Sequence, residues 1–176
     1  METTAKWVLD PAHSELTFKV RHMMITNVKG EFKSFSIDVD GEDITKAKFD
    51  VKIDAASVNT NNDQRDEHLR SADFFDTEKF GELTFATAST KAKGDDEFEL
   101  TGDLTIKGIT KEVKLDAEFG GINKDPWGNE KAGFSFEGKI NRKDWELNWN
   151  AALEAGGVLV SDEVKIYGEV QFVKQS

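Results

Sequence analysis

The chain has 176 residues, no cysteine, two prolines and a formal net charge of −11. The missing cysteines exclude disulfides, thiolate metal sites and cysteine nucleophiles, and the surplus of carboxylates argues against nucleic-acid binding because it repels phosphate backbones. No Pro-, Gly- or Ser-rich tract divides the sequence, so we expect a single domain over residues 1–176.

The N-terminal segment, residues 1–7, has no basic stretch followed by an apolar core and no small-residue cleavage site. It is therefore not typical of a secretory signal. No apolar run approaches the length of roughly 20 residues that a membrane-spanning helix needs. We expect a protein without a membrane span that is cytoplasmic, or periplasmic if a leader has been removed from it.

Apolar and polar residues alternate with a period of two in most extended stretches, which is typical of half-buried antiparallel strands. Eight such stretches cover residues 15–24, 28–40, 46–55, 82–92, 96–107, 110–120, 131–141 and 161–174. Turn-forming pairs such as Asp40-Gly41 and Lys107-Gly108 lie between them. Short connections favour an up-and-down meander, and eight strands close into a barrel that holds side chains or one small ligand.

Two segments interrupt the alternation. Residues 56–81 contain a polar stretch that predicts a short helix over residues 63–70, with Asp63 as its N-cap. A helix this polar is expected to lie across one end of the barrel, held there by Leu69, Phe74 and Phe75. The second segment, residues 150–161, is expected to form a mobile loop at the barrel rim.

The three histidines give weak support for chemistry. His13 and His22 flank the first long strand and lie nine residues apart, so a regular strand places them on opposite faces. His68 has no metal-binding partner at helical spacing. No nucleophile motif and no nucleotide-binding glycine pattern occurs. We therefore predict structural histidines, no catalytic residues, no metal site and no cofactor.

The stretch 141–149 places two tryptophans next to an arginine at a strand end. One interpretation is a clamp in which Arg142 and Trp145 contact a ligand head group by stacking and cation–π interaction. The other is an ion pair that closes the barrel end, with Asp76 or Asp144 as the partner of Arg142.

The interior faces of the strands mix large and small residues. Thirteen phenylalanines are enough to fill a small barrel, whereas the small residues Gly30, Gly102, Ala117, Gly138 and Gly168 favour a cavity. Small residues also let strands bend and coil, so a hollow and a filled barrel both remain open.

Several motifs run in one order along nearly the whole chain, from Trp7 to Val173. They are Trp7-x-x-Asp10-x-x-His13-Ser14-x-x-x-Phe18-x-Val20-x-His22, Val28-x-Gly30-x-Phe32, Asp66-x-His68-Leu69-x-Ser71-x-Asp73-Phe74-Phe75-Asp76, Leu83-Thr84-Phe85, Gly102-x-Leu104-Thr105-Ile106-x-Gly108-x-Thr110-Lys111, Ala132-Gly133-Phe134 and Asn141-Arg142-x-Asp144. With them the chain resembles the YceI-like family of lipocalin-like, polyisoprenoid-binding barrels. It departs from the family pattern at Gly81, where a proline is usual, and at Trp145-Glu146, where Phe-Gly is common.

The resemblance implies an all-β fold: an eight-stranded antiparallel up-and-down barrel with a capping helix near residues 63–70. It also implies a hydrophobic tunnel for the tail of a prenyl lipid, quinone-like compound, fatty acid or fatty amide, and a possible homodimer. It supplies no catalytic residues.

The first hypothesis is therefore a binding or carrier protein for a long-chain isoprenoid or similar amphiphile. The expected ligand-binding residues are Phe18, Val20, His22, Phe35, Ile37, Phe49, Val51, Ile53, Leu69, Phe74, Phe85, Leu104, Ile106, Leu115, Phe134, Phe136, Arg142, Trp145 and Ile166. Among them Arg142 or His22 is expected to meet a polar head group. The alternatives are a barrel enzyme that uses His22 or His68 as acid or base, and a stress-related protein with a filled barrel.

Overall fold

The computed structural model describes residues 6–22, 26–41, 47–72, 74–147 and 160–175. Strands dominate this part of the chain, and one α-helix, α1 (Asp63–Arg70), accompanies them. The strands are β1 (Lys6–Leu9), β2 (Glu15–His22), β3 (Thr26–Phe32), β4 (Phe35–Asp40), β5 (Lys48–Asp54), β6 (Val58–Asn59), β7 (Glu82–Ala92), β8 (Glu97–Ile106), β9 (Ile109–Lys124), β10 (Glu130–Asn141) and β11 (Val160–Gln175).

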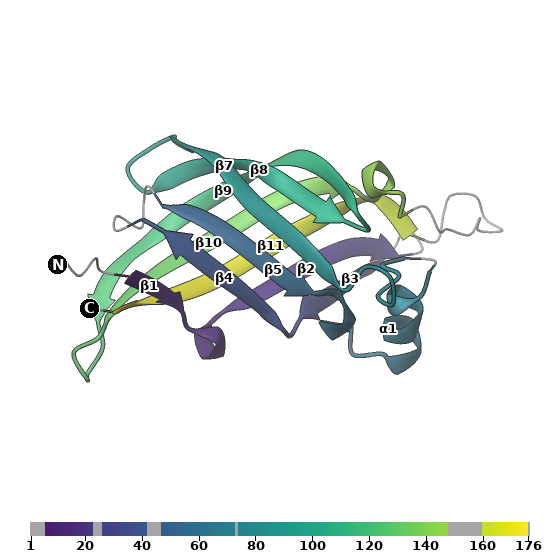
Figure 1. Cartoon of the computed structure of the whole chain (residues 1–176), viewed down its shortest axis with the longest axis horizontal. Coiled ribbons are helices and arrows are strands. Elements are labelled where there is room, and N and C mark those ends of the chain that lie inside the picture. Colours follow the sequence, from purple (N-terminus) through teal and green to yellow (C-terminus); the bar gives the residue numbers. More distant parts are fainter. Residues whose placement is uncertain (1–5, 23–25, 42–46, 73, 148–159, 176) are drawn as a thin grey trace.

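The eleven strands of the described residues form a closed antiparallel barrel with eight positions around its wall, which we call staves (Figure 1). There are fewer staves than strands because three staves each consist of two strands separated by an interruption. β1 and β2 both pair with β11, on either side of the short 3₁₀ turn η1 (Pro11–His13). In the same way β3 and β4 form one stave, and β5 and β6 form another around η2 (Ala55–Ser57). The pairing of β1 with both β4 and β11 closes the ring, which confirms the predicted eight-stranded up-and-down barrel.

The first stave begins earlier than the sequence pattern predicts. The alternation counted from Glu15 overlooks β1, because Pro11 breaks the stave after four residues. The side chain of Asp10 caps the break by accepting a hydrogen bond from the backbone N–H of Ala12 at 3.2 Å. Asp10 also receives a hydrogen bond from Lys131 on β10 at 3.3 Å, which ties the break to the barrel wall.

Helix α1 has the predicted bounds and covers one end of the barrel, while β1 and the end of β11 lie at the opposite end (Figure 1). Its N-cap is Asn62 rather than the predicted Asp63: the Asn62 side chain accepts a hydrogen bond from the backbone N–H of Arg65 at 3.0 Å. Leu69 and Phe75 pack against the core at this end, and Phe74 is buried, as predicted.

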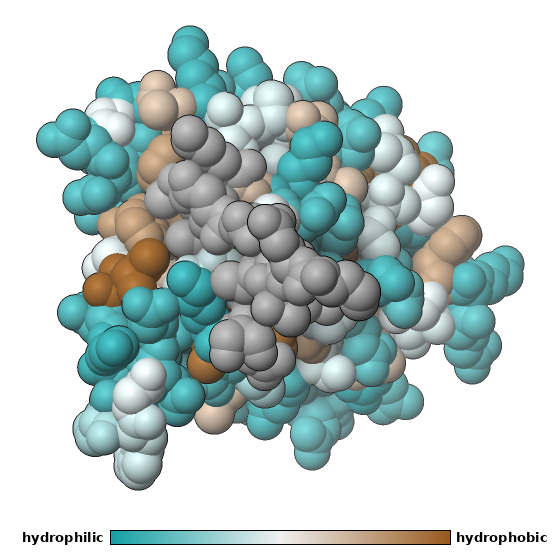
Figure 2. Space-filling view, turned by 60° about the vertical axis from the view of Figure 1, so that its left-hand side comes forward, coloured by the Kyte–Doolittle hydropathy of each residue, from teal (hydrophilic) through white to brown (hydrophobic). Residues whose placement is uncertain are grey.

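The barrel interior contains two groups of buried side chains. The group near β1 is built around five phenylalanines, which we call the phenylalanine plug: Phe49, Phe119, Phe134, Phe136 and Phe172. The group near α1 is built around Phe32, Phe85, Leu104 and Trp145. The outer faces of the strands carry charge, and the surface in Figure 2 is mostly hydrophilic with small separate hydrophobic patches.

Replacing Asp10 by asparagine tests the charged contacts of Asp10 at the break in the first stave. Burial alone would raise the pKa of the Asp10 carboxyl, but its hydrogen bonds with His13 and Lys131 hold the pKa below the ordinary value of 3.8. A lowered pKa stabilises the fold above that ordinary value, and the contribution is lost as the pH falls through the folded-state pKa. Asparagine still caps the turn but lacks the charge that His13 and Lys131 contact, so Asp10→Asn should lower the free energy of unfolding by about 1 kcal/mol at pH 7.

Urea unfolding as a function of pH measures this effect. The difference between Asp10→Asn and the wild type should shrink below pH 4, and a control, Asp103→Asn on the exposed face of β8, should show little difference at any pH. A difference of the same size at pH 7 and in acid would contradict the assignment.

Candidate functional site

The barrel encloses a cavity of about 570 Å³ between the phenylalanine plug and α1. Its wall is formed almost entirely by apolar side chains from the strands, because the inward positions of the period-two pattern are apolar. The volume lies within the range of roughly 300–1,000 Å³ that is typical of small-molecule sites.

The polar residues of the cavity gather mainly at the end covered by α1. Thr60, Asn62, Arg65 and His68 contribute to its lining from this side. Arg142, at the start of the 3₁₀ turn η3 (Arg142–Trp145), contributes from the opposite stave. The cavity therefore has an apolar body and a polar mouth.

A buried hydrogen-bond network fixes α1 at this mouth. Asp66, which is 5% exposed, accepts hydrogen bonds from the backbone N–H of Thr60 at 2.8 Å and from its hydroxyl at 2.6 Å. Arg65 donates from Nε to the Thr60 hydroxyl oxygen at 2.7 Å and from a terminal nitrogen to the Thr60 carbonyl at 2.8 Å. Because Asp66 and Arg65 both hold Thr60, the helix is fixed to the end of β6.

Most of the residues predicted from the sequence to bind a ligand line this cavity. They are Phe18, Val20, Ile37, Phe49, Val51, Ile53, Leu69, Phe74, Phe85, Leu104, Ile106, Leu115, Phe136, Arg142 and Ile166. The backbone of His22 ends β2, but its side chain lies outside the described part of the structure. Most of the predicted rim loop, residues 150–159, also lies outside it.

Three predicted residues are placed elsewhere. Phe134 is buried in the phenylalanine plug, behind Phe136, and Phe35 packs against the same cluster. Trp145 is 2% exposed in the other cluster, where its indole N–H donates to the Leu104 carbonyl at 3.0 Å. The indole of Trp145 therefore supports the barrel wall from behind the cavity lining.

Arg142 combines features of both interpretations drawn from the sequence. Its guanidinium is buried, lines the cavity and donates to the Leu147 carbonyl. It also lies 3.8 Å from the carboxylate of Asp162 on β11, whereas the sequence suggested Asp76 or Asp144. Burial lowers the pKa of Arg142, and the charge of Asp162 acts in the opposite direction.

Two kinds of lining residue were not predicted from the sequence. Apolar residues such as Leu83 and Ile140 share a strand face with Phe85 and Phe136, so the alternation that found those positions contained their signal. The polar residues of α1 and its approach had no such signal, because only the folded chain places them at the mouth. This second group is Thr60, Asn62, Gln64 and Arg65; His68 was considered only under the enzyme alternative.

The interior glycines do not create the cavity, contrary to the expectation that small residues inside the barrel leave empty space. The ring of Phe18 lies across Gly30, its direct cross-strand partner, and a Cβ atom there would collide with the ring. Gly102 accommodates the ring of Phe85 in the same way. These glycines allow large side chains to lie flat along the wall, and the cavity is the space that those side chains surround.

His13 and His68 have local structural partners. The Nδ1 atom of His13 lies 2.8 Å from the Asp10 carboxylate, and His68 meets the ring of Phe74 edge-on at a centroid distance of 5.1 Å. Across the described ranges, no group of three or more His, Cys, Asp or Glu side chains is arranged to hold a metal ion.

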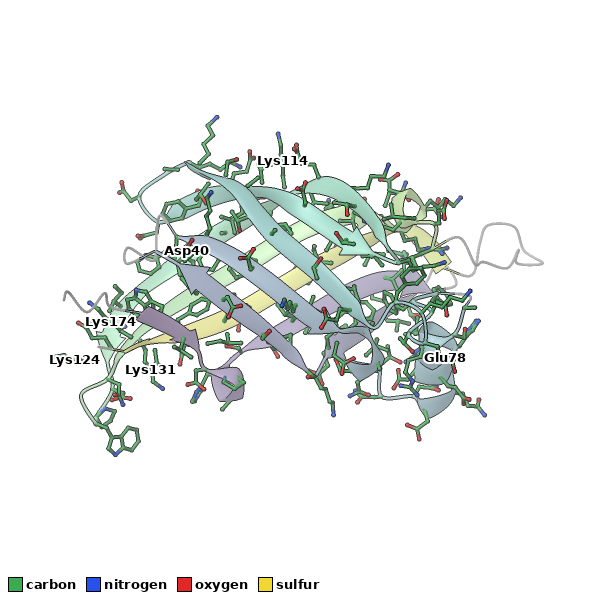
Figure 3. The ribbon with its side chains drawn as sticks, in the orientation of Figure 1. Asp40, Glu78, Lys114, Lys124, Lys131 and Lys174 are labelled. Atoms are coloured by element: carbon green, nitrogen blue, oxygen red, sulfur yellow. The ribbon has the colours of Figure 1, made fainter. Side chains whose placement is uncertain are left out.

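A second hollow, of about 550 Å³, lies over β8–β11 and differs in chemistry. Its lining consists largely of exposed charged residues, including Glu15, Glu97, Asp116, Glu118 and Glu169. Lys93 bridges Asp116 and Glu99 there. Of the lysines labelled in Figure 3, Lys124, Lys131 and Lys174 lie at the end of the barrel near β1, whereas Lys114 lies away from that end. The second hollow is charged, whereas the interior cavity is lined by apolar side chains. The interior cavity is therefore the better site for an apolar ligand.

A closed antiparallel barrel with an apolar cavity and a short helix over its mouth defines a lipocalin-like class of protein. Comparison with known sequences agrees: the YceI-like domain matches residues 7–172, and the chain belongs to the YceI-like family. A UPF0312 protein of Staphylococcus aureus is 42% identical over 169 residues, which cover 94% of this chain and 96% of the relative.

Solved structures show the same fold. The YCEI protein of Campylobacter jejuni is 37% identical, covers 100% of both chains and superposes with a TM-score of 0.77. A polyisoprenoid binding domain from Saccharophagus degradans is 17% identical, covers 97% of this chain and 99% of its own, and has a TM-score of 0.71. Searching the described residues for a helix long and apolar enough to cross a membrane finds none.

The network around Thr60 predicts that Asp66→Ala loosens α1. The substitution leaves a buried backbone N–H and a hydroxyl without their acceptor, so the free energy of unfolding should fall by about 2 kcal/mol. Amide exchange of residues 63–70 should accelerate more than exchange in β8. The matched control, Glu67→Ala, removes the exposed neighbouring carboxylate and should change neither quantity by much. Unchanged exchange of the helix in Asp66→Ala would contradict the network.

Proposed function

We propose that this protein binds or carries a long-chain isoprenoid or a similar amphiphile, such as a prenyl quinone-like lipid, a fatty acid or a fatty amide. The observation that carries the proposal is the cavity of about 570 Å³, apolar along its body and polar at one end. An amphiphile has the same division of chemistry. Its tail would lie among residues such as Val51 and Ile166, with its head group near Arg142 or Arg65.

Burial of the tail supplies enough free energy for such a role. Each methylene group removed from water contributes about 0.8 kcal/mol, so ten of them contribute about 8 kcal/mol before the costs of association. Without those costs, this value corresponds to a dissociation constant of about 1 µM. The polar mouth then serves orientation and selectivity more than affinity.

The comparisons support the same proposal. The chain belongs to the YceI-like family, and the structure from Saccharophagus degradans that shares its fold is described as a polyisoprenoid binding domain. We propose passive sequestration, in which α1 acts as the gate because it covers the mouth. The loop expected over residues 150–161 falls mostly outside the described residues.

Organic extraction of the natively purified protein, followed by mass spectrometry, tests the proposal. A stoichiometric prenyl or acyl species, absent from a denatured-protein control, is the expected result. An empty extract that stays empty after incubation with cell lipids would overturn it. Light scattering on the same sample tests the homodimer that the family resemblance implies.

Filling the cavity should abolish retention of the lipid. Ile166 points into the cavity, so Ile166→Trp is expected to lower the amount of co-purifying lipid at least tenfold, because the added ring occupies the space of the tail. The matched control is Lys165→Trp, which places the same ring on the exposed face of β11. Retention that is equal in both variants would contradict the assignment of the cavity.

The enzyme alternative has one observation in its favour, since His68 lines the cavity. Histidine is the side chain that most often serves as acid or base near neutral pH. A loss of turnover of the extracted lipid in His68→Gln, with unchanged retention, would favour an enzyme over a carrier. The cavity itself argues against the filled-barrel alternative.

A further inference from the structure

The cavity ends at two aromatic rings deep inside the barrel. Phe49 on β5 and Phe136 on β10 belong both to the cavity lining and to the phenylalanine plug. Their ring centroids lie 6.3 Å apart, with the rings edge to face. The side of each ring that faces α1 therefore forms the floor of the cavity.

The floor lies about halfway along the barrel. β10 has 12 residues, and five of them lie between Phe136 and Arg142 at the mouth, so the six steps from one to the other cover about 20 Å along an extended strand. The other half of β10 runs past the plug, where Phe134 stacks on Phe136 at 6.1 Å. A tail that enters past α1 thus reaches only half the length of the barrel.

The plug resists displacement by a ligand. Phe49 contacts the rings of Phe134 at 5.7 Å and Phe172 at 5.8 Å, and Phe172 is fully buried. The backbone of Phe49 is also fixed by Thr87, whose hydroxyl donates to the Phe49 carbonyl at 3.1 Å. A longer tail would have to separate these packed rings, which costs more than burying a few further methylenes returns.

We infer that Phe49 and Phe136 set the maximum tail length of the ligand, and that the limit is about twenty carbons. An extended chain advances about 1.2 Å per backbone atom, so the roughly 20 Å between Arg142 and the floor takes about seventeen carbons in line. This inference rests on the proposed function and makes it more specific: it favours a fatty acyl chain or a prenyl chain of four isoprene units over much longer polyprenyl chains.

Binding of two homologous series tests the limit: saturated fatty acids of 12 to 26 carbons and all-trans prenols of 10 to 40 carbons. In the wild type, affinity for the fatty acids should rise about fourfold with each added methylene and stop rising near twenty carbons. The prenols should show the same limit.

In Phe136→Ala the limit should move to longer chains by roughly three carbons, because the ring frees about 100 Å³ next to the floor. Phe136→Leu and Phe49→Leu are gentler variants that keep the test valid if the alanine variant unfolds. The matched control is Phe134→Leu, in the same plug but behind the floor, which should lower stability without moving the limit.

The outcomes separate this inference from the proposed function. Affinity that keeps rising beyond 24 carbons in the wild type, or a limit that floor variants leave in place, would overturn the inference while the protein still binds lipids. Failure of every member of both series to bind the wild type would overturn the proposed function, and the inference with it.

Discussion

Aromatic packing at one end of the barrel is the interaction on which the rest of the site depends. Five phenylalanine rings fill the interior between β1 and the middle of the barrel. An eight-stranded barrel has just enough interior for side chains or one small ligand. Here the two uses divide the space, because packed rings occupy one half and the cavity begins where the ring contacts end.

The mouth depends on a different kind of interaction. Helix α1 has little apolar surface to bury, and its only buried residue is the charged Asp66. The helix is therefore held mainly by hydrogen bonds to Thr60, together with the contacts of Leu69 and Phe75. A segment with few buried apolar contacts opens more easily than a packed core, so the end covered by α1 is the natural place for a ligand to enter.

The sequence predicted the barrel well because strand alternation is a local pattern that each stave repeats. The interruptions of the staves were harder to predict from the sequence. Pro11 ends β1 after four residues, too few for a period-two pattern, and the break at η2 between β5 and β6 is visible only in the folded chain. The bounds of α1 followed from its polar composition, whereas the choice between Asn62 and Asp63 as N-cap depends on backbone geometry that composition does not contain.

The cavity wall was also largely predictable, since inward positions of a strand recur every second residue. The depth of each residue along the barrel was not predictable, because alternation tells which face of a strand a residue occupies but not its position along the barrel axis. Phe134 and Phe136 share a face, yet one lies in the plug and the other forms the floor. Arg142 and Trp145 give a second example. They belong to one short turn, yet Arg142 lines the cavity and Trp145 lies in the buried cluster behind the cavity wall.

The most direct test of the half-filled barrel is a crystal structure with an 18-carbon fatty acid that carries bromine on its terminal carbon. The bromine gives an anomalous signal that locates the end of the tail. We expect that signal in van der Waals contact with the rings of Phe49 and Phe136. A signal on the outer face over β8–β11, or one beyond the plug near β1, would contradict the account.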